Sequence, residues 1–439
     1  MSSQLQPAPM LIEMPSSDSL VPARSQARLR LLDNVMEFGL MALLFAAVLA
    51  FGAVRPWGIF GLRMGAALLF SVWTLRQVVA DELQIPSSFL PLLVLGIWIG
   101  SQWIAGLTVY RYQTGQAWLT SCSYFLLMLP VSTIATQPAR VRRFLLALAA
   151  FGTALAIFAM VQDVSGTKSI YWLLRPSEFA VQIYGPYVNR NHYAGLMELL
   201  TPLPFLLCLA QRPERRVPLI SCGLLMALSV FLCRSRGGMV ALAAELVFVA
   251  VFLSRIRNRA KSFAAIAAIV AIMVVLIVWV GSDPVVHRLT DMRDMSRMAV
   301  YKDTVRMWWS KPLVGYGAGV FPLVFPTFQS FVIGTDINHA HNEYLELLSE
   351  TGLIGAGLLA WFLVTLYRRG NRLIRPGSRS TGSPEMIAVL AGLTGLLVHG
   401  LVDFNFHIPA NAAFFLVYCA VAATVTLKDA AELHTPERF

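Results

Sequence analysis

Residues 338–355 read NHAHNEYLELLSETGLIG, and the polarity of the chain changes halfway along them. The first half carries His339 and His341 next to Asn342 and Glu343, and the second half leads into an apolar run that ends near residue 367. A run of this length predicts an α-helix that crosses a membrane. Asn342 is placed to cap that helix, and the two glycines of the stretch, Gly352 and Gly355, allow a neighbouring helix to approach closely.

Similar apolar runs recur along the 439-residue chain, of which 57% is hydrophobic and 13% charged. Soluble domains carry about 25% charged residues, and the runs are too long and too uniformly apolar for barrel strands. The sequence therefore predicts an all-α, polytopic integral membrane protein. About twelve transmembrane helices are expected, at 33–54, 59–79, 88–106, 118–136, 142–163, 191–210, 217–233, 238–254, 262–281, 343–367, 385–403 and 411–427.

These spans predict an order of segments along the chain. A flexible cytoplasmic N-terminal tail (1–32) precedes the first five spans, and a cytoplasmic C-terminal tail (428–439) follows the last three. Between them lie spans six to nine with arginine motifs on the outer side, and then a long periplasmic loop that contains short helices. The boundaries of these inner segments are 33–163, 164–281, 282–342 and 343–427.

The net charge of +11 is concentrated in loops that share one side of the membrane if the spans alternate. These loops lie at 24–30, 140–143, 212–216, 255–261 and 368–379. An excess of arginine and lysine marks the cytoplasmic side, so we expect both termini there. The charge then reflects topology, and no nucleic-acid partner is expected. The five cysteines lack metal-ligand or disulfide spacing and are predicted to be core residues.

Most of the unusual polar clusters fall on the opposite side. NRNHYAG (189–195) contains Arg190 and His192, although Asn191 as a helix cap and a snorkelling Arg190 would explain part of it. Arg236 is followed by Gly237 and Gly238 at the start of a span. Glycine amides at a helix N-terminus and a guanidinium group suit a phosphate, while a plain interfacial arginine is the alternative.

The long loop 282–342 contains two further motifs. SRMAVYKDTVRMWWSKP (296–312) carries an apolar stripe of Met298, Tyr301, Val305 and Trp308, which predicts a short amphipathic helix on the outer membrane surface, beginning at Arg297. GYGAG (315–319) lacks the Lys-Ser/Thr of a nucleotide loop and is predicted to be a tight turn.

DFNFHIPAN (403–411) places Asp403, Asn405 and His407 at alternating positions in the last outer turn. These side chains either satisfy buried backbone groups or line the same cavity as the other clusters. His341 lies just before a helix start and fits a general base or a hydrogen-bond donor. The pair of His339 and His341 could bind a metal with Glu343, but no further strong ligand has standard spacing, so no metal is predicted.

On these motifs the chain resembles the bacterial O-antigen ligase and polymerase superfamily. One signature of that family is His-Asn, nine residues, Gly, two residues, then Gly, Thr or Tyr, and His341, Asn342, Gly352 and Gly355 match it. A second, Arg, three residues and Leu, is matched by Arg236 with Val240 in the Leu place. The family's further loop arginine corresponds best to Arg297, with Arg293 as a rival. The motifs cover 190–411; the first five spans agree only in topology.

The resemblance implies an enzyme of the bacterial inner membrane whose active site faces the periplasm. It would transfer a glycan from undecaprenyl diphosphate to an acceptor, typically the lipid A-core, with inversion and without cofactor or metal. The implied catalytic residues are His341 as general base and Arg236 and Arg297 on the diphosphate. Further contacts to substrate are expected from Arg190, His192, His339, Asn342, Asp403, Asn405 and His407.

Two alternatives remain at this stage. A polymerase of the same superfamily uses the same chemistry, and the motifs do not separate it cleanly from a ligase. A transporter would place its polar groups near the middle of the bilayer, often in inverted repeats. Here the spans hold few such groups (Glu198, Glu245), no repeat is visible, and the polar residues crowd one face.

Overall fold

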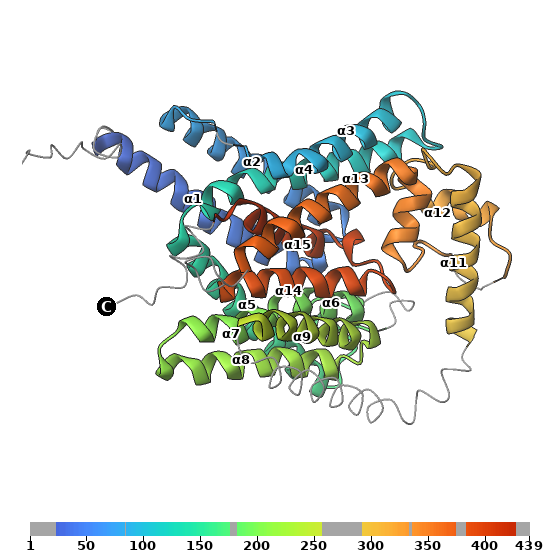
Figure 1. The fold of residues 1–439 in the computed structure, drawn as a ribbon. Helices are drawn as coiled ribbons and strands as arrows, with labels where there is room; N and C mark the ends of the chain where they lie inside the picture. Colours follow the sequence, from blue (N-terminus) through green and yellow to red (C-terminus); the bar gives the residue numbers. More distant parts are fainter. Residues whose placement is uncertain are drawn as a thin grey trace, which may run out of the picture.

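The structure is a computed structural model that describes residues 23–83, 85–175, 182–256, 292–332, 336–374 and 383–426. Across these ranges the chain forms helices, with isolated bridges only near residues 170–189. The helices (Figure 1) are α1 (Ala23–Leu49), α2 (Pro56–Ala80), α3 (Leu90–Ile104), α4 (Arg111–Ala135), α5 (Pro138–Val164), α6 (Arg190–Leu200), α7 (Pro202–Leu207), α8 (Pro213–Leu232), α9 (Arg236–Ile256), α11 (Met292–Ser310), α12 (Phe321–Val324), α13 (Glu343–Ile374), α14 (Pro384–His399) and α15 (Pro409–Thr424). Five 3₁₀ turns complete them: η2 (Phe51–Ala53), η3 (Ser87–Phe89), η4 (Cys208–Ala210), η5 (Phe325–Thr327) and η6 (Asn405–His407).

The helical membrane class is confirmed. Eight helices within the described ranges are long and apolar enough to cross a membrane, and α14 and α15 are shorter apolar helices. Each predicted span coincides with a helix, except 262–281, which lies outside the described residues. The number twelve and the outer position of 282–342 therefore stay predictions.

Helix α1 differs from the predicted tail because it begins at Ala23, ten residues before the expected start at residue 33. Residues 23–32 are mostly Ala, Leu and Arg, which are strong helix formers. The positive flank of the first span is thus part of the helix. Residues 1–22 and 428–439 of the two predicted tails lie outside the described residues.

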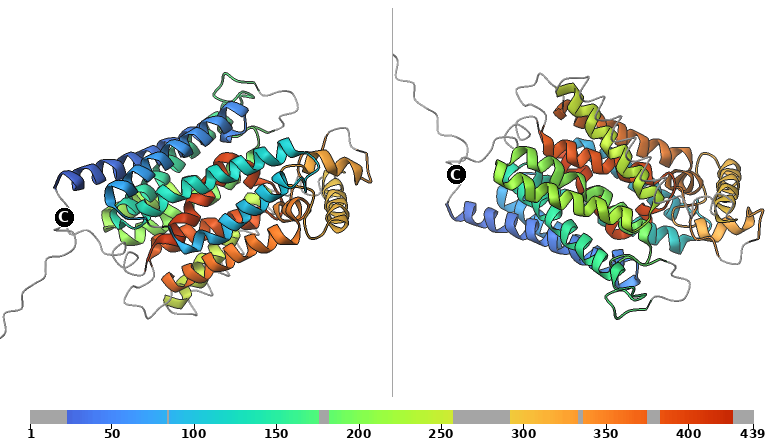
Figure 2. Two further views of the ribbon diagram at one scale, coloured as in Figure 1. Left: turned by 90° about the horizontal axis from the view of Figure 1, so that it is seen from above. Right: turned by 90° about the horizontal axis from the view of Figure 1, so that it is seen from below.

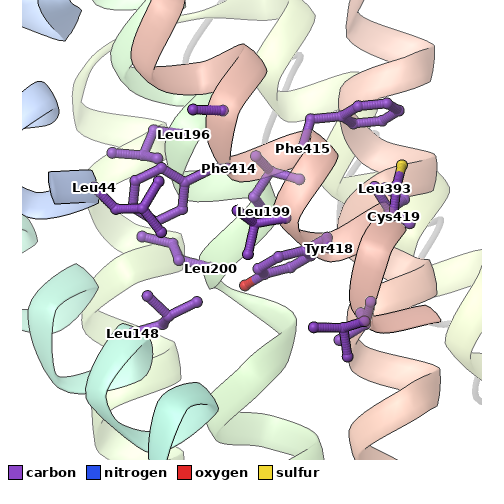
Figure 3. Close-up of a cluster of buried hydrophobic side chains, with 14 of the residues drawn as sticks. Leu44, Leu148, Leu196, Leu199, Leu200, Leu393, Phe414, Phe415, Tyr418 and Cys419 are labelled. Carbon is purple, nitrogen blue, oxygen red and sulfur yellow. The ribbon is translucent and has the colours of Figure 1, made fainter. Parts of the chain in front are cut away.

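The centre of the bundle is formed by α6, α14 and α15 (Figure 3). Leu199 and Leu200 of α6 lie against Phe414 and Tyr418 of α15, and all four side chains are fully buried. A Cβ added at Gly392 of α14 would lie 2.7 Å from the carbonyl oxygen of Leu199, so α6 and α14 are in backbone contact. Because lipid gives little hydrophobic drive between helices, such close packing holds the bundle together.

Two of the predicted basic loops meet at one end of the bundle. Glu37 of α1 is fully buried and accepts hydrogen bonds from Arg140 and Arg143 at the start of α5. Arg142 of the same turn donates to the carbonyl oxygen of Ala210, 3.1 Å away, in the connection between α7 and α8. These contacts agree with the expectation that residues 140–143 and 212–216 share one side.

Helix α11 lies across the opposite end of the bundle, crosswise to the long helices in Figure 1, and the views of Figure 2 place it at the same end. It confirms that this part of the loop is helical, but the helix begins at Met292, five residues before the predicted start at Arg297. Met298 and Val305 of the predicted stripe are 66% and 41% exposed, whereas Asp303 and Met307 are fully buried. Met298 and Val305 therefore face away from the bundle, where a membrane surface could cover them, whereas Tyr301 of the same stripe contacts the segment before α13.

The GYGAG turn (315–319) of the loop packs against α13 near Gly352. Helix α13 kinks at Gly352 (φ 67°, ψ −171°). The Leu353 amide donates to the carbonyl oxygen of Pro312 (2.9 Å), and the Gly317 amide donates to that of Glu350 (2.8 Å). Gly315, Gly317 and Gly319 all have positive φ, which confirms the tight turn predicted for GYGAG. The kink thus holds the loop against the first turns of α13.

Replacing Gly352 with Ala is expected to destabilise the protein by about 3 kcal/mol. A Cβ there would lie 2.1 Å from the carbonyl oxygen of Leu313, and the backbone conformation is one that only glycine adopts readily. Thermal unfolding in detergent measures the loss. Gly357→Ala is the matched control, because nothing lies within 4 Å of the added Cβ. Equal stability of the two variants would contradict the kink.

Candidate active site

The candidate site lies at the end of the bundle that carries α11 (Figure 1). Four segments meet there around the turn that connects α14 to α15, residues 400–408. They are the first turns of α6 and α9, the helix α11, and the segment 336–342 that leads into α13. The polar clusters that the sequence assigns to one face are therefore neighbours in space.

His341 faces the carboxylate of Asp403. Its Nδ1 atom lies 3.6 Å from Asp403 Oδ1, slightly longer than a hydrogen bond, and its side chain is 35% exposed. The imidazole also contacts the ring of Phe404 edge to face, with centroids 4.9 Å apart. His341 has a φ of 51°, which a non-glycine residue seldom adopts, and Tyr301 donates to its carbonyl oxygen at 2.9 Å. The backbone is thus held in a conformation that turns the imidazole toward the carboxylate.

Asp403 is 1% exposed and is held from several sides. Its Oδ2 atom accepts a 2.6 Å hydrogen bond from Asn191 Nδ2 at the start of α6, and His399 Nε2 lies 4.0 Å away. Burial by itself would raise the pKa of Asp403, but His341 and the imidazoles of His192 and His399 more than offset it. The pKa of Asp403 therefore lies well below its usual range, and the carboxylate stays ionised.

A second imidazole–carboxylate pair lies behind the first, inside the bundle. His399 Nδ1 is 2.7 Å from Glu198 Oε1, and both residues are essentially buried. His192, also buried, packs against Phe404 with centroids 4.8 Å apart. Ionisable groups within membrane helices are costly and are generally retained for function.

The arginines approach this cluster from two helices. Arg236 begins α9 and is exposed, and the adjacent Gly237 packs so closely that a Cβ would lie 2.5 Å from His399 Nε2. Arg297 of α11 lies within electrostatic range of His399 and Tyr301. Arg190, half-buried at the start of α6, lies within range of Cys233, just before α9. The guanidinium groups thus belong to the segments that surround Asp403.

The glycines after Arg236 do not act as the sequence suggested. The Gly238 amide donates to Ser235 Oγ at 3.2 Å, so the helix cap already uses it. A Cβ at Gly238 would lie 2.7 Å from the Cβ of Ala194 on α6. The prediction that the Gly238 amide is available to bind a phosphate is therefore wrong. The two glycines instead allow α6 and α14 to approach α9 closely.

His339 and His407 form a separate cluster with two glutamates of α13. His339 Nδ1 lies 2.8 Å and His407 Nε2 lies 3.2 Å from Glu346 Oε1, and His407 Nδ1 lies 3.1 Å from Glu343 Oε2. Burial would lower the pKa of His407, but Glu346 and Glu343 outweigh it and raise the pKa to about 10. His339 stacks on Phe404 with centroids 4.3 Å apart, so this cluster adjoins His341.

Asn342 and Asn405 are engaged within the protein. Asn342 Oδ1 accepts from the amides of Tyr344 (3.1 Å) and Leu345 (3.0 Å), which confirms the predicted cap of α13. Asn405 is fully buried, and its Oδ1 accepts from Asn411 Nδ2 at 3.1 Å. Both asparagines fix the segments that carry the site.

An apolar cavity of about 870 Å³ lies between α3, α4, α13 and α15. Leucine, isoleucine and phenylalanine side chains line most of it, and Glu343, Glu350 and His407 contribute its two carboxylates and its imidazole. Because His407 contacts His339, with ring centroids 4.5 Å apart, the polar part of the cavity adjoins the His341 cluster.

Fold and site define a polytopic helical membrane protein with an imidazole–carboxylate centre at one end of its bundle. Residues 222–360 match the family model described as O-antigen ligase. This match covers about a third of the chain and supports the predicted resemblance to the O-antigen ligase and polymerase superfamily over that region, which contains Arg236, Arg297 and His341. Arg190, Asp403 and His407 lie outside the matched region. No curated protein matches the chain.

Sequence analysis missed several residues of this site. Glu346 stands three residues after Glu343 and four before Glu350, and this spacing places three carboxylates on one helix face. From the sequence, Glu198 is placed in a span without a partner and His399 is assigned no role. The signal for this pair is a carboxylate in one apolar span and an imidazole in another, because ionisable groups in membrane helices tend to pair with each other.

Proposed function

We propose that the chain is an O-antigen ligase-type glycosyltransferase of the bacterial inner membrane. It transfers a glycan from undecaprenyl diphosphate to an acceptor sugar, typically of the lipid A-core, at the periplasmic face, without a metal in the reaction. The observation that carries the proposal is the pairing of His341, the histidine of the family motif, with a buried, ionised Asp403. The match of residues 222–360 to the O-antigen ligase family supports it.

His341 acts as the general base. With Nδ1 directed at Asp403, the Nε2 atom is left to accept the proton of the acceptor hydroxyl as that oxygen attacks the anomeric carbon. The imidazolium that forms is stabilised by the Asp403 carboxylate, and the carboxylate also fixes the orientation of the ring. Attack opposite to the leaving diphosphate inverts the anomeric configuration.

The arginines bind the diphosphate of the donor. Negative charge grows on this leaving group as the glycosidic bond breaks, so fixed guanidinium groups stabilise the transition state more than the bound substrate. Arg236 and Arg297 have this role, with Arg190 beside them. Arginines retained on the outer side against the charge rule call for a separate reason, and an anionic ligand supplies one.

The apolar cavity between α3, α4, α13 and α15 takes part of the polyprenyl chain. Its leucine and isoleucine walls suit a hydrocarbon, and its polar groups lie next to the His341 cluster. A donor bound there would have its tail among the helices and its diphosphate near the arginines.

Purified protein in detergent, given a lipid-diphosphate glycan and candidate acceptors, tests the proposal. We expect glycan transfer to a lipid A-core acceptor, with the configuration inverted, and activity that survives a metal chelator. Extension of one lipid-linked glycan by another would instead identify a polymerase. No transfer to any acceptor by folded protein would contradict the proposed reaction.

A further inference from the structure

We propose that His339, Glu346 and His407 form a binding site for one divalent transition-metal ion, with Zn²⁺ as the best fit. This site lies beside the proposed reaction centre and is not part of the reaction. The three residues come from three segments: the one before α13, α13 itself, and η6. Their ligand atoms lie within 4.8 Å of one another.

The donor atoms are nearly at the spacing of a tetrahedral site. Zinc bonds of roughly 2.0–2.1 Å to nitrogen or oxygen place neighbouring ligands of a tetrahedron on the order of 3.3 Å apart. Glu346 Oε1 lies 3.2 Å from His407 Nε2 and 2.8 Å from His339 Nδ1. The ligand atoms of His339 and His407 lie within 4.8 Å of each other, so the two imidazoles would move toward each other to admit the ion. Two imidazoles and one carboxylate are also a ligand set that zinc uses in proteins.

The groups behind the ligands have the arrangement that metal sites require. The other ring nitrogen of His407, Nδ1, lies 3.1 Å from Glu343 Oε2, and the other oxygen of Glu346, Oε2, accepts from the Ala340 amide at 2.7 Å. A carboxylate on the far nitrogen of a ligating histidine fixes its tautomer and raises its basicity. In His407 and Glu346, one polar atom is thus directed at the centre while the other is already held.

The charge around the centre also favours a cation. Glu343, Glu346 and Glu350 are 7%, 1% and 6% exposed, and all three lie on the face of α13 that is turned to His407. Buried carboxylates need a counter-charge, and a divalent ion supplies more of it than the single imidazolium of His407. The side chains of His339 and His407 are 25% and 31% exposed, so an ion has access from the surface.

Metal binding would join the segment 336–342 to α13 and to η6. His341 is two residues from the ligand His339, and Phe404 contacts both imidazoles. The ion would therefore fix the segment that carries the proposed base, as a clamp on the site.

Zn²⁺ titration of the full-length protein by calorimetry, after treatment with a chelator, tests this inference. We expect one ion per chain, and Co²⁺ in its place should give the absorption bands of a four-coordinate ion. His339→Ala and His407→Ala should each weaken binding by at least about 100-fold. Glu343→Gln, which removes only the supporting carboxylate, should weaken it about 10- to 100-fold.

His341→Ala is the matched control, because it removes a neighbouring imidazole outside the ligand set and should leave the affinity unchanged. Each variant is also checked for cooperative thermal unfolding without metal, and His339 is the informative position because its side chain is partly exposed. Substoichiometric binding, or the same affinity in folded His339→Ala as in the unaltered protein, would overturn the site. Neither result depends on glycan transfer, so the proposed function is tested separately.

Discussion

His341→Ala is expected to lower the rate of glycan transfer at least about 100-fold, because general-base catalysis contributes about 10²- to 10⁴-fold. The side chain is 35% exposed and lies at the edge of the bundle, so its removal leaves the packed core intact. Steady-state transfer to the acceptor, with the purified variant at matched concentration, measures the effect. Thermal unfolding and membrane insertion should match the unaltered protein.

The pairing with Asp403 sharpens this prediction. Asp403→Asn keeps the size of the side chain but removes the charge that stabilises the imidazolium, so transfer should also fall. Residues that act as one unit are not additive, and the double variant should be about as slow as His341→Ala alone. Full activity of folded His341→Ala would remove the base assignment, whereas additive losses would separate Asp403 from His341.

The fold was predictable because membrane helices are encoded locally. An apolar run of sufficient length implies a span whatever its neighbours are, and helices occupy each predicted span within the described residues. The kink of α13 was not predicted, because Gly352 takes a positive φ only in contact with the Leu313 backbone. Similarly, α1 extends into the predicted tail because charged helix formers escape a search for apolar residues.

The site was predictable as a region but not as a set of contacts. Charge bias and alternation of spans placed the clusters around Arg190, His341 and Asp403 on one face, and the structure brings the last two to 3.6 Å. The pairs themselves depend on tertiary packing. His399 and Glu198 are 201 residues apart, and no local spacing links them.

The buried charges of α13 explain why the segment before it is ordered. Glu346 accepts from the Ala340 amide, and Glu350 accepts from the Phe321 amide at 2.8 Å, so carboxylates of one helix hold two loop segments. A buried carboxylate that gains such bonds is stabilised, whereas an unpaired one is costly. The polar face of α13 thus positions His341 through the backbone rather than through the imidazole.

Arg236→Ala is expected to lower kcat/KM for the lipid-diphosphate donor about 100- to 1,000-fold, the usual cost of removing one preorganised transition-state contact. Arg236→Lys should recover only part of this loss. Lysine keeps the charge but lacks the planar pair of donors that binds two phosphate oxygens at once. Transfer kinetics at varied donor concentration measure both variants.

Arg234→Lys is the matched control for Arg236→Lys, since Arg234 is exposed in the same turn two residues earlier and should tolerate the change. The loss in Arg236→Lys should appear in kcat as well as in KM, because the contact strengthens as charge builds on the leaving diphosphate. A lysine variant as active as the unaltered protein would show that charge alone suffices. A loss confined to KM would show that Arg236 binds the donor without stabilising the transition state.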